Sequence, residues 1–187
     1  MRLPLIAGNW KMHGTIASIE KLLAQLSPGV AQSSVEWAVL APAVYLGTVQ
    51  SALSDSIISW GAQTVSEHPE GAFTGDCSLS MLADFDCRYV LVGHSERRQG
   101  AGESNAVVAA KFQACLKSNI LPILCVGETL AERKAGITLE IVQEQLAVAL
   151  RLQDNLPALK KSVIAYEPVW AIGTGLSATP EQAEAVH

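Results

Sequence analysis

The sequence has few charged residues and no long hydrophobic run. Charged residues make up 17% of its 187 residues, hydrophobic residues make up 49%, and the net charge is −5. This composition excludes a disordered chain, and the negative charge argues against a nucleic-acid partner or an anionic membrane. Every apolar run is too short for a signal peptide or a membrane span. We therefore expect one cytoplasmic domain over residues 1–187, with no membrane and no nucleic-acid partner.

Motifs for metals and dinucleotides are missing as well. The cysteines form no Cys-x-x-Cys pair and have no zinc-like spacing with a histidine. They are Cys77, Cys87, Cys115 and Cys125, and reduced thiols fit the cytoplasm. No Gly-x-Gly-x-x-Gly segment follows an expected strand, which argues against a dinucleotide. We therefore expect no metal and no dinucleotide cofactor.

Short apolar runs alternate with helical patterns along the chain. The runs are almost continuously apolar, which predicts parallel strands buried on both faces. Apolar stripes at helical spacing predict helices that pack on this sheet. The alternation predicts an α/β fold, either an open doubly wound sheet or a closed barrel. The expected strands are 3–8, 35–41, 57–63, 88–93, 120–127 and 162–167, and the helical stripes lie in 16–26, 107–116 and 141–150.

Polar side chains follow the expected strands, at the edge where ligands bind in α/β folds. Glu167 ends the sixth strand between apolar neighbours, a setting that suits a general base. His94 follows the fourth strand, and we expect Ser95 behind it to cap a short helix. The positive end of that helix would favour a neutral histidine. Taken singly, each of these residues is as consistent with a structural role as with catalysis.

Three further features suit an anionic substrate. Lys11 lies close to Asn9 after the first strand. Gly173 and Gly175 allow the backbone N–H groups of a loop to surround an anion, although two glycines alone are weak evidence. We interpret Glu96 as an ion-pair partner of a neighbouring cation. Together with the two residues above, these features indicate acid/base chemistry on a small anionic substrate.

Two segments have unusual lengths. Residues 64–78 form the longest loop-like stretch, and such loops usually bind a partner or a ligand. Thr179 begins a well-capped helix with Gln182, yet only five residues follow that glutamine. We therefore interpret the sequence as interrupted in its C-terminal part.

Five segments resemble the signature segments of the triosephosphate isomerase family. They are "GNWKM", "GAFTGD", "YVLVGHSERR", "PILCVGE" and "AYEPVWAIGTG", and they follow the family's order at about its spacing over essentially all 187 residues. The resemblance implies a (β/α)8 TIM barrel that interconverts dihydroxyacetone phosphate and D-glyceraldehyde 3-phosphate in glycolysis and gluconeogenesis. It also implies a homodimer and no cofactor.

The resemblance implies a role for each matching residue. Glu167 would be the general base that moves a proton between two carbons, and His94 the neutral electrophile that polarises the carbonyl. Three further matches would contact the substrate: Lys11 near its charge, Asn9 beside the enediolate oxygen, and Gly173 as the lid glycine at the phosphate. Glu96 would be an acid near the site, and Cys125 a buried structural cysteine. Thr74 would lie near the tip of the 64–78 loop, which inserts into the neighbouring subunit.

The chain departs from the family in length. It has six expected βα units, whereas the family has eight, and the serine-bearing and Gly-Gly phosphate loops after strands seven and eight do not occur in this sequence. One hypothesis is an isomerase whose C-terminal portion is missing here, and we favour it because the capped helix looks cut. The other is a catalytically poor, truncated barrel that acts only as a folded or assembling module. A different phosphosugar barrel enzyme is disfavoured by the specific pair "GHSERR" and "AYEPVWAIGTG".

Overall fold

One parallel sheet runs through the computed structural model, which describes residues 3–30, 34–150 and 156–187. Its six described strands are hydrogen-bonded in sequence order, β1-β2-β3-β4-β5-β6. A doubly wound sheet reverses its strand order, so this sequential order belongs to a barrel-type fold. Each strand overlaps the run predicted for it. The strands are β1 (Leu5–Asn9), β2 (Glu36–Ala41), β3 (Ile58–Ala62), β4 (Tyr89–Val92), β5 (Leu121–Val126) and β6 (Val163–Tyr166).

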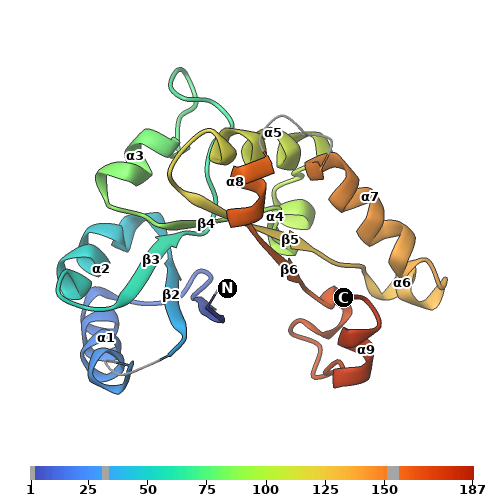
Figure 1. Ribbon diagram of the computed structural model, residues 1–187, viewed down its shortest axis with the longest axis horizontal. Coiled ribbons are helices and arrows are strands. Elements are labelled where there is room, and N and C mark those ends of the chain that lie inside the picture. Colours follow the sequence, from blue (N-terminus) through green and yellow to red (C-terminus); the bar gives the residue numbers. More distant parts are fainter. Residues whose placement is uncertain (1–2, 31–33, 151–155) are drawn as a thin grey trace.

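Helices follow the strands and form an arc outside the curled sheet (Figure 1). The three predicted helical stripes fall within α1, α5 and α7, as their apolar spacing required. The predicted capping box is also confirmed, because Thr179 and Gln182 cap the start of α9 reciprocally. The helices are α1 (Ile16–Val30), α2 (Leu46–Leu53), α3 (Leu79–Asp84), α4 (Ser95–Gly100), α5 (Asn105–Leu116), α6 (Leu130–Lys134), α7 (Thr138–Leu150), α8 (Leu156–Lys161) and α9 (Pro180–Glu184), with the 3₁₀ turns η1 (Ala43–Tyr45) and η3 (Val169–Ala171).

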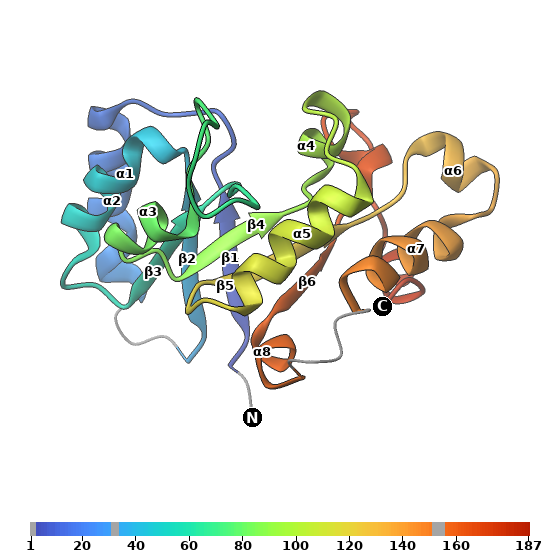
Figure 2. The same cartoon turned by 90° about the horizontal axis from the view of Figure 1, so that it is seen from above.

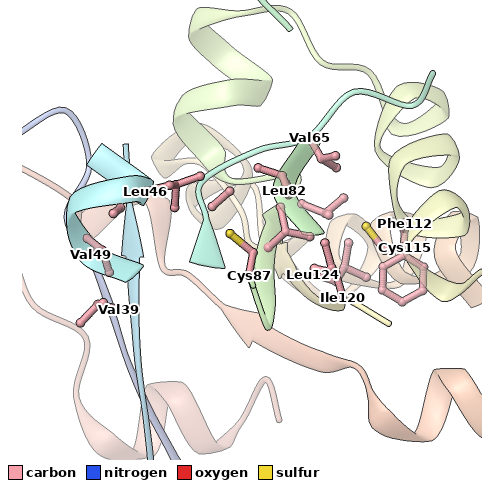
Figure 3. Packing of buried hydrophobic residues seen from close by; sticks show 14 of the residues in the cluster. Val39, Leu46, Val49, Val65, Leu82, Cys87, Phe112, Cys115, Ile120 and Leu124 are labelled. Carbon is pink, nitrogen blue, oxygen red and sulfur yellow. The ribbon is translucent and has the colours of Figure 1, made fainter. Parts of the chain in front are cut away.

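The main hydrophobic core lies between the sheet and the outer helices (Figure 3). Val39 of β2, Leu46 of α2, Phe112 of α5 and Leu124 of β5 are all buried in it. A second, smaller cluster includes Leu40 and other residues that alternate along the strands with those of the main core. Apolar side chains therefore line both faces of the central strands, as in a barrel.

The prediction that the strands are buried on both faces is right for the centre of the sheet and wrong at its edges. Every residue of β4 is buried, whereas β1 and β6 are mostly half-buried or exposed. Ile6 and Ile164 are 47% and 49% exposed. The cause is topological, since β1 pairs with β2 and β6 with β5, and neither has a second neighbour among the described strands. The molecule is thus a partial (β/α) barrel, open between β1 and β6 (Figures 1 and 2).

Candidate active site

The strand ends bring polar side chains from distant parts of the sequence to one edge of the sheet. Because all described pairings are parallel, the carboxyl ends of the strands lie at the same side. Asn9 ends β1, His94 follows β4, and Glu167 follows β6. A cavity of about 320 Å³ opens here, and Asn9, Lys11, Gln63 and His94 are among its lining residues.

One contact at this edge joins His94 and Glu167. Nε2 of His94 lies 3.1 Å from Oε1 of Glu167, and the two side chains are only 7% and 19% exposed. The backbone N–H of Ser95 donates to the other carboxylate oxygen, Oε2, at 3.3 Å. Each oxygen of Glu167 therefore faces a donor from the turn between β4 and α4, which orients the carboxylate toward the histidine.

The proton on His94 is assigned by a second hydrogen bond. The backbone N–H of Glu96 donates to Nδ1 of His94 at 3.2 Å, so Nδ1 acts as an acceptor and the ring proton lies on Nε2. His94 is itself the N-cap of α4, and the prediction that Ser95 caps this helix is wrong. The imidazole nitrogen reaches the N–H two residues on, which is the bond an N-cap side chain normally makes. The helix thus presents a neutral imidazole whose N–H faces Glu167.

Lys11 has an unusual backbone that two amide side chains stabilise. Its φ is +53°, a left-handed value that costs energy in a residue with a side chain. Asn9 accepts the Lys11 N–H at 2.9 Å, and Nε2 of Gln63 donates to the Lys11 carbonyl at 2.9 Å. The ammonium group pairs with Oε1 of Glu96 at 2.7 Å. That hydrogen bond from Lys11 lowers the pKa of Glu96, so the predicted ion pair is present.

Cys125 lies behind the carboxylate and is buried, as predicted. Burial, followed by the nearby charge of Glu167, raises its pKa well above the usual value for a thiol. A protonated thiol in such surroundings is a poor nucleophile. Cys125 therefore supports the site by packing, and it lines a smaller cavity of about 180 Å³ together with Glu167 and Ser95.

Glu128 is a residue of this edge whose role the sequence did not reveal. It is 0% exposed and accepts hydrogen bonds from the Tyr166 hydroxyl, the Trp170 indole and the Arg133 guanidinium, each at 3.0 Å. Burial, and then the charge of Glu128, raises the pKa of Tyr166 to about 12. One buried carboxylate thus ties β6, η3 and α6 together. The aromatic residues on either side of Glu167 were a partial signal, since buried Tyr and Trp need polar partners.

The segment after Glu167 has a fixed beginning and an exposed tip. Trp170 is buried in η3, and Oγ1 of Thr174 donates to its carbonyl at 2.9 Å. Gly173 lies at the exposed tip with φ +69°, a conformation that glycine adopts without steric cost. Gly173, predicted to contact phosphate, is not among the residues that line the cavity at the strand ends.

The 64–78 loop projects away from the sheet (Figure 1). Its neck is closed by a hydrogen bond from the Ser66 hydroxyl to Asp76 at 2.9 Å, and His68 stacks on Phe73 with ring centroids 3.9 Å apart. Thr74 near the tip is exposed. The loop has internal structure, but it does not bring Thr74 to the cavity at the strand ends.

Neither a metal site nor a membrane-spanning helix was found in the described ranges. No group of three or more His, Cys, Asp or Glu side chains there could hold a metal ion. No helix within those ranges combines the length and the apolar character needed to cross a membrane.

Two comparisons place the chain among known proteins. The family model described as triosephosphate isomerase matches residues 4–187. The chain is 56% identical over 187 residues to the triosephosphate isomerase of Thiobacillus denitrificans. This alignment covers the whole chain and 74% of the length of that relative. It is also 56% identical to that of Coxiella burnetii (strain Dugway 5J108-111), covering 73% of it. It is 54% identical to that of Dechloromonas aromatica, covering 75%. All three alignments include the entire chain.

Proposed function

This chain belongs to the triosephosphate isomerase family, and from that premise we propose that it interconverts dihydroxyacetone phosphate and D-glyceraldehyde 3-phosphate. The observation that carries the proposal is the 3.1 Å contact between Nε2 of His94 and Oε1 of Glu167. A carboxylate next to a neutral imidazole N–H supplies the base and the hydrogen-bond donor that an aldose–ketose isomerisation requires. This family is itself the standard example of that pairing.

We assign the proton transfers to the two residues in contact. The Glu167 carboxylate removes a proton from C1 of dihydroxyacetone phosphate, and the electron pair of that bond forms the double bond of an enediolate. The Nε2–H of His94 hydrogen-bonds to the carbonyl oxygen at C2 and moves a proton between the two oxygens. Glu167 then returns its proton to C2, which yields the aldose with no net gain or loss of atoms.

Lys11 and Asn9 are proposed to receive the charged parts of the substrate. The Lys11 ammonium lies at the cavity with its backbone fixed by Asn9 and Gln63, so its position is set before substrate arrives. A fixed positive charge stabilises a developing oxyanion more than a mobile one, because no reorganisation is needed during the reaction. The volume of about 320 Å³ is also within the range of small-molecule sites.

The segment from Pro168 to Leu176 is proposed to be the lid. Its anchored end, at Trp170 and Glu128, stays in place, while the tip with Gly173 moves over the substrate so that its N–H meets the phosphate. Closing such a loop excludes water and prevents loss of the enediolate intermediate. The same family is the usual example of this closure.

We also propose a cytoplasmic homodimer that forms through the 64–78 loop. Thr74 at the exposed tip would enter the partner beside Lys11. An apolar residue next to that position supports the idea: Met12 is 94% exposed and lines the same cavity. A partner loop that covers Met12 would remove this apolar surface from water.

The open edges of the sheet favour a second candidate. β1 and β6 are paired on one side only, and Ile6 and Ile164 are half exposed. The chain also covers only 74% of the Thiobacillus relative. The 187 residues would then be a folded or assembling module with poor catalysis, because the remainder of the phosphate cradle is not encoded in them.

Intact mass and an isomerase assay together decide between the two candidates. A mass near 19.8 kDa identifies a protein made of these 187 residues alone, and a larger mass supports an isomerase with a further C-terminal portion. Formation of dihydroxyacetone phosphate from D-glyceraldehyde 3-phosphate is then coupled to NADH oxidation. Turnover above the enzyme-free rate supports the isomerase, whereas folded protein of 19.8 kDa without such turnover supports the module.

A further inference from the structure

A glutamine on α7 binds both backbone polar groups of Gly127, the residue directly after β5. The Gly127 N–H donates to Oε1 of Gln145 at 2.8 Å, and Nε2 of Gln145 donates to the Gly127 carbonyl at 3.0 Å. A side-chain amide carries one acceptor and a donor group, so it can imitate the pairing of a neighbouring strand. Gln145 thereby fixes the sheet edge one residue beyond the end of β5.

Gly127 is in direct contact with the backbone of Glu167. The last pair of the β5–β6 ladder is Val126 with Tyr166, and the Glu167 N–H then donates to the Val126 carbonyl at 2.7 Å. A Cβ atom at Gly127 would overlap the Glu167 carbonyl oxygen. Only glycine permits this approach, so the position of the Gly127 peptide limits where the Glu167 backbone can lie.

The contact matters because Glu167 directly follows the last pair of the β5–β6 ladder. Gln145, Gly127 and Glu167 also line the same cavity of about 180 Å³. Without the amide of Gln145, the Gly127 N–H and carbonyl would lose these two hydrogen bonds.

We propose that Gln145 is a positioning residue for the isomerisation, which holds Glu167 against His94 by fixing the Gly127 peptide. The inference rests on the proposed function in one respect, namely that Glu167 is the base. The side chain of Gln145 does not contact the reacting atoms. Its effect is on geometry, and displacements of about 1 Å in a catalytic group can cost roughly 10²-fold in rate.

Three variants separate this role from ordinary packing. Gln145→Met keeps the length of the side chain but removes both hydrogen bonds. Gln145→Glu keeps an acceptor for the Gly127 N–H but turns a carboxylate oxygen toward the Gly127 carbonyl oxygen, so it should not restore the wild-type geometry. Gln143→Met is the matched control, because Gln143 lies on the same helix with an exposed side chain.

The first readout needs no turnover. Amide hydrogen exchange at Gly127 and Glu167, followed by NMR in the 187-residue protein, should accelerate at least about 10-fold in Gln145→Met and stay unchanged in Gln143→Met. Unchanged exchange at Glu167 in Gln145→Met would overturn the proposal. This readout shows whether Gln145 positions Glu167 even if the wild-type chain has no isomerase activity. A lack of activity would count against the proposed function, but not against the positioning role of Gln145.

The second readout applies to active protein. In Gln145→Met we expect kcat to fall roughly 10- to 100-fold with KM changed less than about 3-fold, because the substrate contacts stay in place. Gln145→Glu should likewise fail to restore the wild-type kcat. A wild-type kcat in Gln145→Met, or a loss confined to KM, would also overturn the proposal.

Discussion

Nε2 of His94 and Oε1 of Glu167 lie 3.1 Å apart, although the two residues follow different strands, β4 and β6, with β5 between them. The contact depends on three local features. Glu96 holds the histidine in one tautomer, Ser95 holds the second carboxylate oxygen, and the β5–β6 ladder ends where Glu167 begins. In the proposed mechanism, this contact brings the base and the hydrogen-bond donor together before substrate is bound.

Shortening the 64–78 loop is expected to produce monomers with weak activity. The loop is exposed around Thr74, and in the proposed dimer it is the element that enters the partner. Sedimentation velocity would measure the change in mass, and the coupled assay the change in activity. A stable dimer after the deletion would exclude this loop as the interface.

Replacing Lys111 by Met should destabilise the fold by about 1.5–3 kcal/mol, because it removes one of the two cations that bond to the carboxylate of Glu103 and leaves only Arg97. Lys111 and Glu103 are both buried, with Nζ and Oε1 2.7 Å apart. Lys111 also donates to Thr64, at the base of the 64–78 loop. Denaturation by guanidinium chloride measures the loss.

The double variant Lys111→Met with Glu103→Gln is the control for that experiment. It removes both charges, so it should recover part of the lost free energy of unfolding. A single Lys111→Met variant as stable as the wild type would show that the pair contributes nothing.

The stability of the protein should decrease as the pH falls below about 4.5, the ordinary pKa of a glutamate. Burial opposes ionisation of Glu103, but the hydrogen bonds from Lys111 and Arg97 outweigh it and lower its pKa. Because the pKa of Glu103 is lower in the folded state than in the unfolded state, its ion pairs stabilise the protein fully above the unfolded-state pKa. That stabilisation is lost as the pH falls through the folded-state pKa. Denaturation midpoints of wild type and Glu103→Gln measure this, and the variant should depend less on pH in that window. Parallel pH curves would rule out Glu103 as the source.

Native protein should react with a thiol reagent mainly at Cys77. Burial raises the pKa of Cys87 and of Cys115 to about 12, and Cys125 is shifted the same way. Cys77 is the half-buried member of the four. Titration with a chromogenic disulfide should detect about one fast thiol, which Cys77→Ser removes. Several thiols reacting at one rate would contradict the burial seen here.

The sequence predicted the strands, the principal helices and the edge at which the site lies. Continuous apolar runs and helical stripes are local patterns, and parallel strands place their carboxyl ends together. His94 shows what local patterns miss, since an imidazole acceptor replaced the expected Ser95 cap. Gln145 could not be recognised either, because a polar residue on a helix gives no sign that it pairs with Gly127, 18 positions earlier.

The central claim, that Glu167 is the base of an isomerase, is tested most directly by kcat of Glu167→Gln beside the wild type. The amide keeps the shape of the side chain and one acceptor oxygen, but it cannot take a proton from carbon. In the complete enzyme we predict a kcat lower by roughly 10²- to 10⁴-fold in the coupled isomerase assay. A near-normal kcat in Glu167→Gln would contradict the account.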